Sequence, residues 1–489
     1  MNFSKLLCFL IVFSFVISCK NDDSAIGPLE PPNKEGTLTL TTSVVVDNDN
    51  KLILYNGGDV ALKNNVVINE TTYALNTTDT DFMVGKAYTL TIGNDSYTFY
   101  RTQLPVIDIN TNGGEIIDPD KIAADFVLYE TDKDPFESII GIEFRGGLSV
   151  TFPKKSYGIE LWEDTAGTTF NESLLGMRSD DDWILDAMYN EPAKLRDFVS
   201  HDLWLDMARY HYSAQESDIT FGIKRQYVEI FVNGKYGGVY WLGEKIDRKQ
   251  LGLERYDSGI RGELYKGDDW GEGTLYNSLE PFDNNSLFWS GFEADYPDDI
   301  GEVDWTNLHD FVDFVINADD ATFDAEMNTR MDVPNLIDYF IFVNIIFAQD
   351  NLGKNIFTGR YDQDAPYFHV AWDMDSSWGN DFIGDRADPA TYPLFNGMYR
   401  RLQGNNDFVT ALKARWMELR GNLLSDASLE ARFIAAHNYL SSNGVYEREA
   451  IDANLIQKPY DPAEIDFITA WLKERNTYLD GWIAISETP

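Results

Sequence analysis

Residues 227–244, YVEIFVNGKYGGVYWLGE, contain an Asn-Gly pair between two apolar runs. Such a pair is a strong signal for a tight β-hairpin, because both residues tolerate the positive φ angles of the turn. Other short apolar runs occur over residues 104–264, where one amphipathic segment at 192–209 has apolar residues four apart. We therefore predict a β-rich region that contains one helix.

Beyond residue 300 the hydrophobic pattern becomes mainly helical. The segments with this pattern are residues 305–318, 335–349, 408–424, 429–443 and 464–483. A β-rich half followed by a helical half predicts one two-lobed α+β domain over residues 104–489, with a cleft between its lobes.

Residues 37–103 precede this domain and carry short β-type runs separated by turn residues. We predict a small all-β sandwich module here, which serves as a spacer or an adhesive module. A calcium site is one interpretation of its turn at Asp47–Asp49. The turn lacks the closing Glu of a calcium loop, however, so a plain hairpin turn is expected.

Residues 1–19, MNFSKLLCFLIVFSFVISC, have the pattern of a secretory signal peptide. The apolar run ends at Ile17 and is shorter than the roughly 20 residues that span a bilayer. The VISC ending resembles a bacterial lipobox, which implies that Cys19 is acylated and begins the mature chain. The alternative is an ordinary signal peptide in which this cysteine has no role.

Residues 20–36 are rich in Pro, Asn and charged residues and are predicted to form a flexible tether. Its first residues, KNDD, resemble the acidic tag of surface lipoproteins in the Bacteroidetes. The resemblance implies an outer membrane lipoprotein exposed at the cell surface, with the membrane contacted through the lipid on Cys19.

The chain has 489 residues, with 39 Lys and Arg against 81 Asp and Glu, and a formal net charge of −42. A surface with this charge repels phosphate backbones and anionic headgroups, which excludes nucleic-acid binding and membrane binding through a basic patch. Hydrophobic residues make up 44% of the chain, which is enough to exclude global disorder.

Four segments place charged residues inside otherwise apolar patterns, where burial is costly without a partner or a function. They are residues 145–157 (RGGLSVTFPKKSY), 227–244, 349–355 (QDNLGKN) and 371–379 (AWDMDSSWG). Asp373 and Asp375 are two residues apart, so an extended backbone would point both to one face, which suits a divalent cation. With few His and Cys residues and hard oxygen ligands, Mg²⁺ or Mn²⁺ is expected rather than zinc.

In this order, the four segments resemble the spore coat protein H (CotH) family of atypical protein kinases. The motifs that carry the resemblance are RG followed by FPKKSY, LRDF, NGKYGGVYWLGEKID, QD with KN, and WDMDSSWG, within a similarity from about residue 104 to the C-terminus. The resemblance implies a two-lobed, diverged protein-kinase-like domain that binds ATP with Mg²⁺ or Mn²⁺. It would transfer a phosphoryl group to Ser or Thr hydroxyls of extracytoplasmic or surface proteins.

Asp350 and Asn355 reproduce the D-x-x-x-x-N spacing of the kinase catalytic loop. On that comparison Asp350 is the catalytic residue that accepts or orients the hydroxyl proton, and Asn355 holds a metal ion. Asp373 or Asp375 takes the part of the metal-binding Asp of kinases. One of these two aspartates can equally be structural.

The predicted phosphate contacts come from the β-rich half. Lys154 or Lys155 would neutralise the α- and β-phosphates of ATP, and the sequence does not distinguish between them. Arg145 is a second candidate for binding phosphate, and Glu244 is a candidate for lining the nucleotide cleft. The helix at 192–209 offers no Glu to pair with a nucleotide lysine.

Each site residue also has a structural interpretation. Asp350 can cap a helix, Lys154 and Lys155 can lie on an exposed strand edge, Glu244 can be a salt-bridged core residue, and Arg145 can brace the two lobes. At the level of the whole protein, the alternative function is an inactive kinase-like surface protein for adhesion or glycan capture. The aromatic residues for glycan binding would be Trp270, Phe288-Trp289 and those of 292–296, although core packing is the expectation for them.

Overall fold

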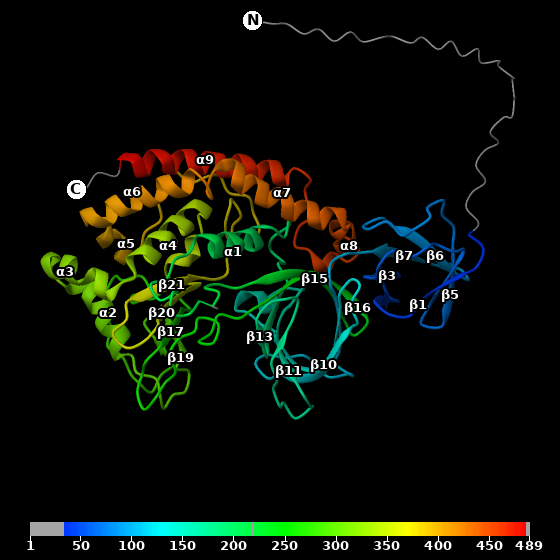
Figure 1. Ribbon diagram of the computed structural model, residues 1–489, viewed down its shortest axis with the longest axis horizontal. Helices are drawn as coiled ribbons and strands as arrows, with labels where there is room; N and C mark the ends of the chain where they lie inside the picture. The colour runs from blue at the N-terminus through cyan, green and yellow to red at the C-terminus, as the bar shows by residue number, and fades with distance from the viewer. Residues whose placement is uncertain (1–33, 218, 486–489) are drawn as a thin grey trace, which may run out of the picture.

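The computed structural model describes residues 34–217 and 219–485 (Figure 1). The predicted signal peptide, the acylation of Cys19 and nearly all of the predicted tether lie outside these residues. None of the described helices combines the length and the apolar composition that crossing a membrane requires.

The N-terminal module is built from strands only, as predicted. They are β1 (Thr37–Leu40), β2 (Val44–Asp47), β3 (Leu52–Tyr55), β4 (Asn65–Ile68), β5 (Thr71–Leu75), β6 (Tyr88–Ile92) and β7 (Asp95–Arg101). Parallel pairing of β1 with β4 and of β3 with β7 joins all seven into one sheet, in the order β1-β4-β5-β6-β7-β3-β2. The strands therefore form one continuous sheet around an apolar core, where the sequence predicted a sandwich of two sheets.

A closed barrel follows the module. Its strands are β8 (Val106–Asn110), β9 (Ile122–Tyr129), β10 (Phe136–Arg145), β11 (Ser156–Trp162), β14 (Asp182–Asp186), β15 (Arg225–Val232) and β16 (Lys235–Gly243). The predicted hairpin is confirmed, because β15 pairs antiparallel with β16 and both Asn233 and Gly234 at its turn have positive φ. The domain boundary at residue 103 stays a prediction; β7 ends two residues before it.

Shorter elements connect the barrel strands and lead to the second sheet. They are η1 (Leu148–Thr151), β12 (Glu172–Ser173), β13 (Ser179–Asp180) and α1 (Arg196–Met207). The helix predicted at 192–209 is thus present as α1, two to four residues shorter at its ends. Its buried face includes Val199, Leu203 and Met207, three of the residues that gave the spacing of four.

The second sheet has the strand order β18-β19-β17-β20-β21. Its strands are β17 (Glu263–Gly267), β18 (Phe288–Trp289), β19 (Phe292–Tyr296), β20 (Ile356–Arg360) and β21 (Tyr367–Ala371). The sequence placed the end of the β-rich region near residue 264, whereas four of these strands lie beyond it. Their apolar runs are short, and helices separate β19 from β20, so hydrophobic periodicity gives little sign of them.

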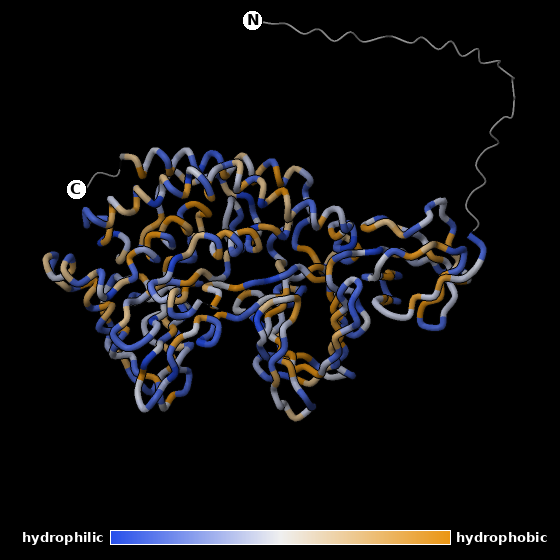
Figure 2. The backbone as a smooth tube through the Cα atoms, viewed as in Figure 1, coloured by the Kyte–Doolittle hydropathy of each residue, from blue (hydrophilic) through white to orange (hydrophobic). Residues whose placement is uncertain are grey.

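A layer of helices covers this sheet and extends over the barrel (Figure 1). It comprises α2 (Thr306–Asn317), α3 (Asp320–Arg330), α4 (Val333–Ile346), η2 (Gln349–Leu352), α5 (Gly397–Leu402), α6 (Asn406–Arg420), α7 (Asp426–Ser442), α8 (Val445–Glu449), η3 (Ala453–Leu455) and α9 (Glu464–Ile485). Nearly every side chain of α4 is buried, and this helix packs against β21, α6 and α9. Figure 2 shows hydrophobic segments where the helices meet the sheet, and also in the barrel and in the N-terminal module. The fold is therefore a mixture of helices and sheets.

The turn at Asp47 attaches the N-terminal module to the barrel. The Asp47 carboxylate accepts hydrogen bonds from the backbone N–H groups of Asp49, Asn50 and Tyr236, all at 2.9 Å. Asp49 also forms an ion pair with Lys235 at 3.1 Å. The predicted turn is confirmed. The Asp47 carboxylate, which a calcium site would need as a ligand, already accepts N–H groups.

Candidate functional site

The two segments that carry the predicted catalytic and metal-binding residues meet at one end of the second sheet. Ile356 of β20 pairs with Ala371 of β21, so residue 355 immediately precedes one strand and residue 372 follows the other. Asn351 fixes this junction, since its side-chain amide donates to the carbonyl oxygens of Asn355 and Trp372, both at 2.7 Å. Sequence reasoning missed Asn351, although it lies between the two residues of the D-x-x-x-x-N pattern.

Asp350 lies in η2 and is partly exposed. Its carboxylate does not cap this short helix, so the helix-cap interpretation is wrong. Burial raises the pKa of Asp350, while the nearby Lys354 ammonium opposes the rise. Asn355 has a left-handed backbone, with φ of 54°, and its N–H donates to the carbonyl oxygen of Gly267 at 2.9 Å.

Asp373 and Asp375 do not lie on an extended strand, so that part of the prediction is wrong. The strand ends at Ala371, and Asp373 has a φ of 56°, which places it in a left-handed turn. The residue between the two aspartates is held from α1, because the backbone N–H of Met374 donates to Asp197 Oδ1 at 2.9 Å. Asn190 donates to Asp375 Oδ2 at 2.5 Å. The turn therefore takes its shape from the start of α1 and the loop before it.

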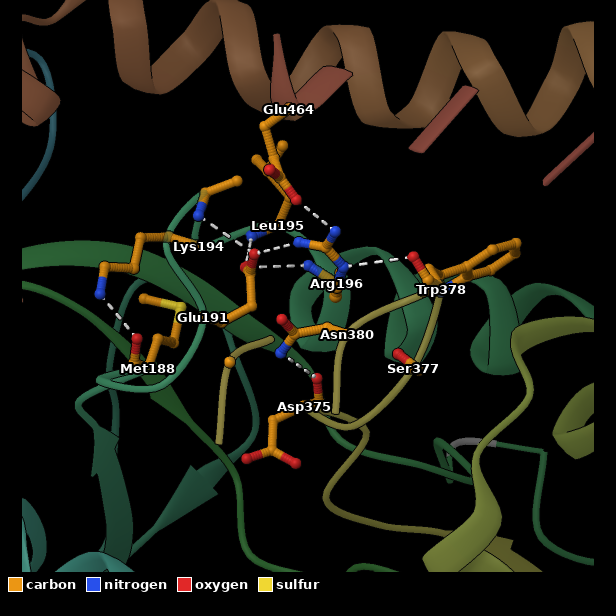
Figure 3. A network of polar contacts seen from close by, with 12 residues as sticks. Met188, Glu191, Lys194, Leu195, Arg196, Asp375, Ser377, Trp378, Asn380 and Glu464 are labelled. Carbon is orange, nitrogen blue, oxygen red and sulfur yellow. Dashed lines mark hydrogen bonds and ion pairs between the residues drawn. The ribbon is translucent and has the colours of Figure 1, made fainter. Parts of the chain in front are cut away.

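Figure 3 shows how the start of α1 contacts the segment that follows the Asp373–Asp375 turn. Arg196 is fully buried; it pairs with Glu191 at 2.7 Å and with Glu464, and its Nε donates to the carbonyl oxygen of Trp378 at 3.4 Å. Asn380 donates to the backbone carbonyl of Asp375 at 3.3 Å, and the Asp375 carboxylate points away from this network. The LRDF motif thus supplies two anchors, Arg196 and Asp197, for the segment that carries the acidic pair.

Several carboxylates lie within electrostatic reach of one another. Burial and repulsion from Asp375 and Asp197 raise the pKa of Asp373 well above its ordinary value. The Arg145 guanidinium opposes this rise. Burial raises the pKa of Asp375 to about 7, and Asp197 and Asp186 add to the rise while Asn190 opposes it.

Asp197 stays ionised within this group. Burial alone would raise its pKa, but His201, Arg225 and the Met374 N–H lower it to about 2. Asp186 accepts a hydrogen bond from the Met188 N–H at 2.8 Å, and burial raises its pKa. The cluster of Asp186, Asp197, Asp373 and Asp375, which we call the acidic cluster, therefore carries repulsion that a cation would relieve.

The acidic cluster is not a complete metal cage. Within residues 34–217 and 219–485, no three or more His, Cys, Asp or Glu side chains gather closely enough to hold a metal ion by themselves. Protein sites for Mg²⁺ commonly use one or two carboxylates, with water and a phosphate ligand completing the coordination. The donor set thus suits a cation that binds together with a phosphate ligand.

The two candidate lysines lie in different environments. Lys154 is buried; its Nζ lies 2.6 Å from Glu449 Oε1 and donates to the Val239 carbonyl oxygen at 2.6 Å. Burial lowers the pKa of Lys154 to about 8, although Glu449 opposes the shift. Lys155 is partly exposed and donates to the Val150 carbonyl oxygen at 2.5 Å. The strand-edge interpretation is therefore wrong for Lys154.

Arg145 connects the barrel to the acidic cluster. Its guanidinium lies over the ring of Trp372, 5.1 Å from the centroid. Burial lowers its pKa, and Asp186 and Asp373 oppose this shift, which shows that all three groups lie near one another. Arg145 thus links the end of β10 to Trp372, which follows β21, through a ring contact. Its interpretation as a brace through a carboxylate and its phosphate contact both stay predictions.

Glu244 is buried directly after β16. Its two carboxylate oxygens accept backbone N–H groups, from Arg178 at 3.0 Å and from Lys224 at 2.9 Å. It therefore links two backbone segments of the barrel region. Its role in lining a nucleotide cleft stays a prediction.

The predicted aromatic residues divide into two groups. Trp289 and Phe292 belong to the hydrophobic core, while Trp270 and Phe288 are exposed. Phe288 lies in the two-residue strand β18, and Trp270 lies outside the strands. The core expectation is therefore confirmed for Trp289 and Phe292, and Tyr296 is partly buried against the same core.

Comparison with known families places this chain in one of them. Residues 142–479, more than half of the chain, match the family model described as CotH kinase protein. The chain therefore belongs to the CotH kinase family, as its motifs predicted. The match begins within β10, so β8, β9 and the N-terminal module precede it.

A characterised relative has the same name as the family. Inner spore coat protein H of Bacillus subtilis (strain 168) is 24% identical to this chain over 356 residues. The aligned region covers 71% of this chain and 88% of the relative. At this identity, the residue roles proposed below rest on the motifs and contacts of this chain.

We predict that Asn351→Asp lowers the free energy of unfolding by about 1–3 kcal/mol, because a carboxylate would replace the donor that satisfies two buried carbonyl oxygens. Urea unfolding followed by circular dichroism measures the change. Asn277→Asp, at an exposed position, is the matched control. Equal unfolding midpoints for the two variants would contradict the role of Asn351.

Proposed function

We propose that this chain is a two-lobed, kinase-like phosphotransferase, which transfers the γ-phosphoryl group of ATP to Ser or Thr hydroxyls of proteins outside the cytoplasm. One observation carries the proposal: Asn351 joins the loop of Asp350 and Asn355 to the turn that holds Asp373 and Asp375. In protein kinases a D-x-x-x-x-N loop and a downstream Asp act together in the same way.

The arrangement of the barrel and the second sheet supports a site between two lobes. Arg145 and Lys154 come from the barrel region, whereas Asp350 and the Asp373–Asp375 turn come from the second sheet and its helices. Basic groups on one side and acidic metal ligands on the other suit a nucleotide phosphate chain that binds between them. The barrel would be the nucleotide-binding lobe of the kinase-like domain.

Asp350 is proposed as the group that accepts or orients the proton of the attacking hydroxyl. Its raised pKa and partial exposure suit a proton acceptor that a substrate can reach. Asp373, Asp375 and Asn355 would hold Mg²⁺ or Mn²⁺, which offsets the charge of the phosphates when bound. Asn190 and Asp197 would keep the two aspartates in place without contacting the substrate.

The buried ion pair favours Lys154 over Lys155 as the phosphate contact. In protein kinases the nucleotide lysine is paired with a Glu on a helix. Lys154 is paired in this way with Glu449, on α8, rather than with a residue of α1. Lys194 lies 3.6 Å from the other oxygen of Glu449, so two cations share one carboxylate.

We expect the full chain to transfer phosphate from labelled ATP in the presence of Mn²⁺ and a protein acceptor. Asp350→Asn should lower kcat by about 10²–10⁴-fold, because general acid–base groups contribute that much. ATP-dependent thermal stabilisation should persist in this variant, since Asp350 is not a metal ligand.

Asp388→Asn is the control for this assay, because it makes the same change at an exposed position beyond the acidic cluster. If the unmodified protein showed neither transfer nor stabilisation by ATP, the kinase proposal would be abandoned. The alternative of adhesion or glycan capture would then remain, and binding of the protein to immobilised glycans would test it.

For location, we propose an outer membrane lipoprotein at the cell surface, anchored through acylated Cys19. The sequence motifs at residues 16–23 support this proposal. Cys19→Ala should shift the protein from the membrane fraction to the soluble fraction, because a signal peptide alone leaves no lipid on the chain. Fractionation followed by immunoblotting measures this shift, and unchanged membrane retention would rule out the anchor.

A further inference from the structure

The N-terminal module lies against the turn that starts α8 (Figure 1). Gly85 of the module has no room for a side chain, because a Cβ there would lie 2.2 Å from the carbonyl oxygen of Ser442. A Cβ at Gly444, the N-cap of α8, would lie 2.6 Å from the carbonyl oxygen of Gly85. The two backbones are therefore in direct contact, and the position of the module limits where α8 can lie.

A fully buried ion pair extends this contact to the far end of α8. Arg448 donates from Nε and Nη2 to the two oxygens of Glu229, at 2.7 and 2.6 Å. Thr102, in the segment that connects module and barrel, donates to the same carboxylate at 2.9 Å. The Arg448 guanidinium also lies over the ring of Tyr100, at the end of the module's last strand.

The residue after Arg448 holds the candidate phosphate-binding lysine. Glu449 accepts from Lys154 Nζ at 2.6 Å and from the Val239 N–H at 3.0 Å. Since α8 has only five residues, its two neighbouring side chains cannot move independently. Arg448 is paired with Glu229 of barrel strand β15, which Thr102 of the connecting segment also contacts. Arg448 also lies over Tyr100 of the module, while its neighbour Glu449 fixes Lys154.

We propose that the N-terminal module is a positioning element of the active site: its contact with α8 sets the position of Glu449 and, through it, the ammonium group of Lys154. The sequence had suggested a spacer or an adhesive module. The consequence for ATP binding rests on the proposed function, whereas the mechanical coupling does not. Because the family match begins at residue 142, the coupling involves a part of the chain outside the matched region.

Gly85→Ala tests the coupling in the full chain, because the added methyl group separates the module from Ser442. Gly93→Ala is the matched control: Gly93 lies in the same module, also has a positive φ, and has nothing within 4 Å of an added Cβ. Backbone strain is therefore similar in the two variants, and only Gly85→Ala disturbs the contact with α8.

The first measurement is acetylation of Lys154 by acetic anhydride, quantified by peptide mass spectrometry with the exposed Lys133 as an internal reference. A buried amine reacts only when the surrounding structure opens. Lys154 should react several-fold faster in Gly85→Ala than in the wild type or in Gly93→Ala. Equal rates in the two variants would overturn the proposal.

The second measurement is the KM for ATP, which should rise about tenfold in Gly85→Ala, while the KM for the protein acceptor stays the same. Faster acetylation with an unchanged KM for ATP would overturn the link to the active site. If the wild type transfers no phosphate, the acetylation result still decides the coupling, and only the proposed function fails.

Thr102→Val supplies the same comparison if Gly85→Ala does not fold. The change is nearly isosteric and removes the hydrogen bond to Glu229. Thr98→Val, at an exposed position in the same module, is its control. Faster acetylation of Lys154 in Thr102→Val than in Thr98→Val supports the coupling, and equal rates overturn it.

Discussion

The hydrogen bond from the Met374 N–H to the Asp197 carboxylate determines where the two central aspartates lie. It ties the turn after β21 to the first turn of α1, and Arg196 ties the following residues to the same helix through Trp378. A carboxylate with a pKa of about 2 accepts this bond in its charged form, so the bond is a charge-assisted one. Asp197 thus positions the turn of the acidic cluster and at the same time repels Asp373 and Asp375.

Several cations are buried in this acidic protein. Arg196, Arg448 and Lys154 all lie in the interior, and each is paired with a buried carboxylate. Removing one member of such a pair would leave an uncompensated charge, which costs more than the pair contributes. Since buried carboxylates match these buried cations, the net charge of −42 is carried mainly by the surface. Arg145 and Arg225 both lie next to the acidic cluster.

The sequence predicted the elements that local patterns encode. The Asn-Gly hairpin, the amphipathic α1 and the long helices beyond residue 300 each carry a periodicity or a turn signal. The single continuous sheet of the module and the strands β18–β21 were not predicted, since they depend on pairing between distant runs. The D-x-x-x-x-N spacing located the candidate site, but the interior-facing Lys154 and its partner Glu449 are 295 residues apart, and no local pattern connects them.

The central claim is that the acidic cluster binds a divalent cation together with ATP, and thermal melting of Asp373→Asn tests it most directly. Without ligands, the variant should melt about 2 °C or more above the wild type, because one repelling carboxylate is gone. Mn²⁺ with ATP should raise the melting temperature of the wild type and leave that of the variant nearly unchanged. A variant that melts no higher than the wild type, or that keeps the full Mn²⁺–ATP shift, would contradict the claim.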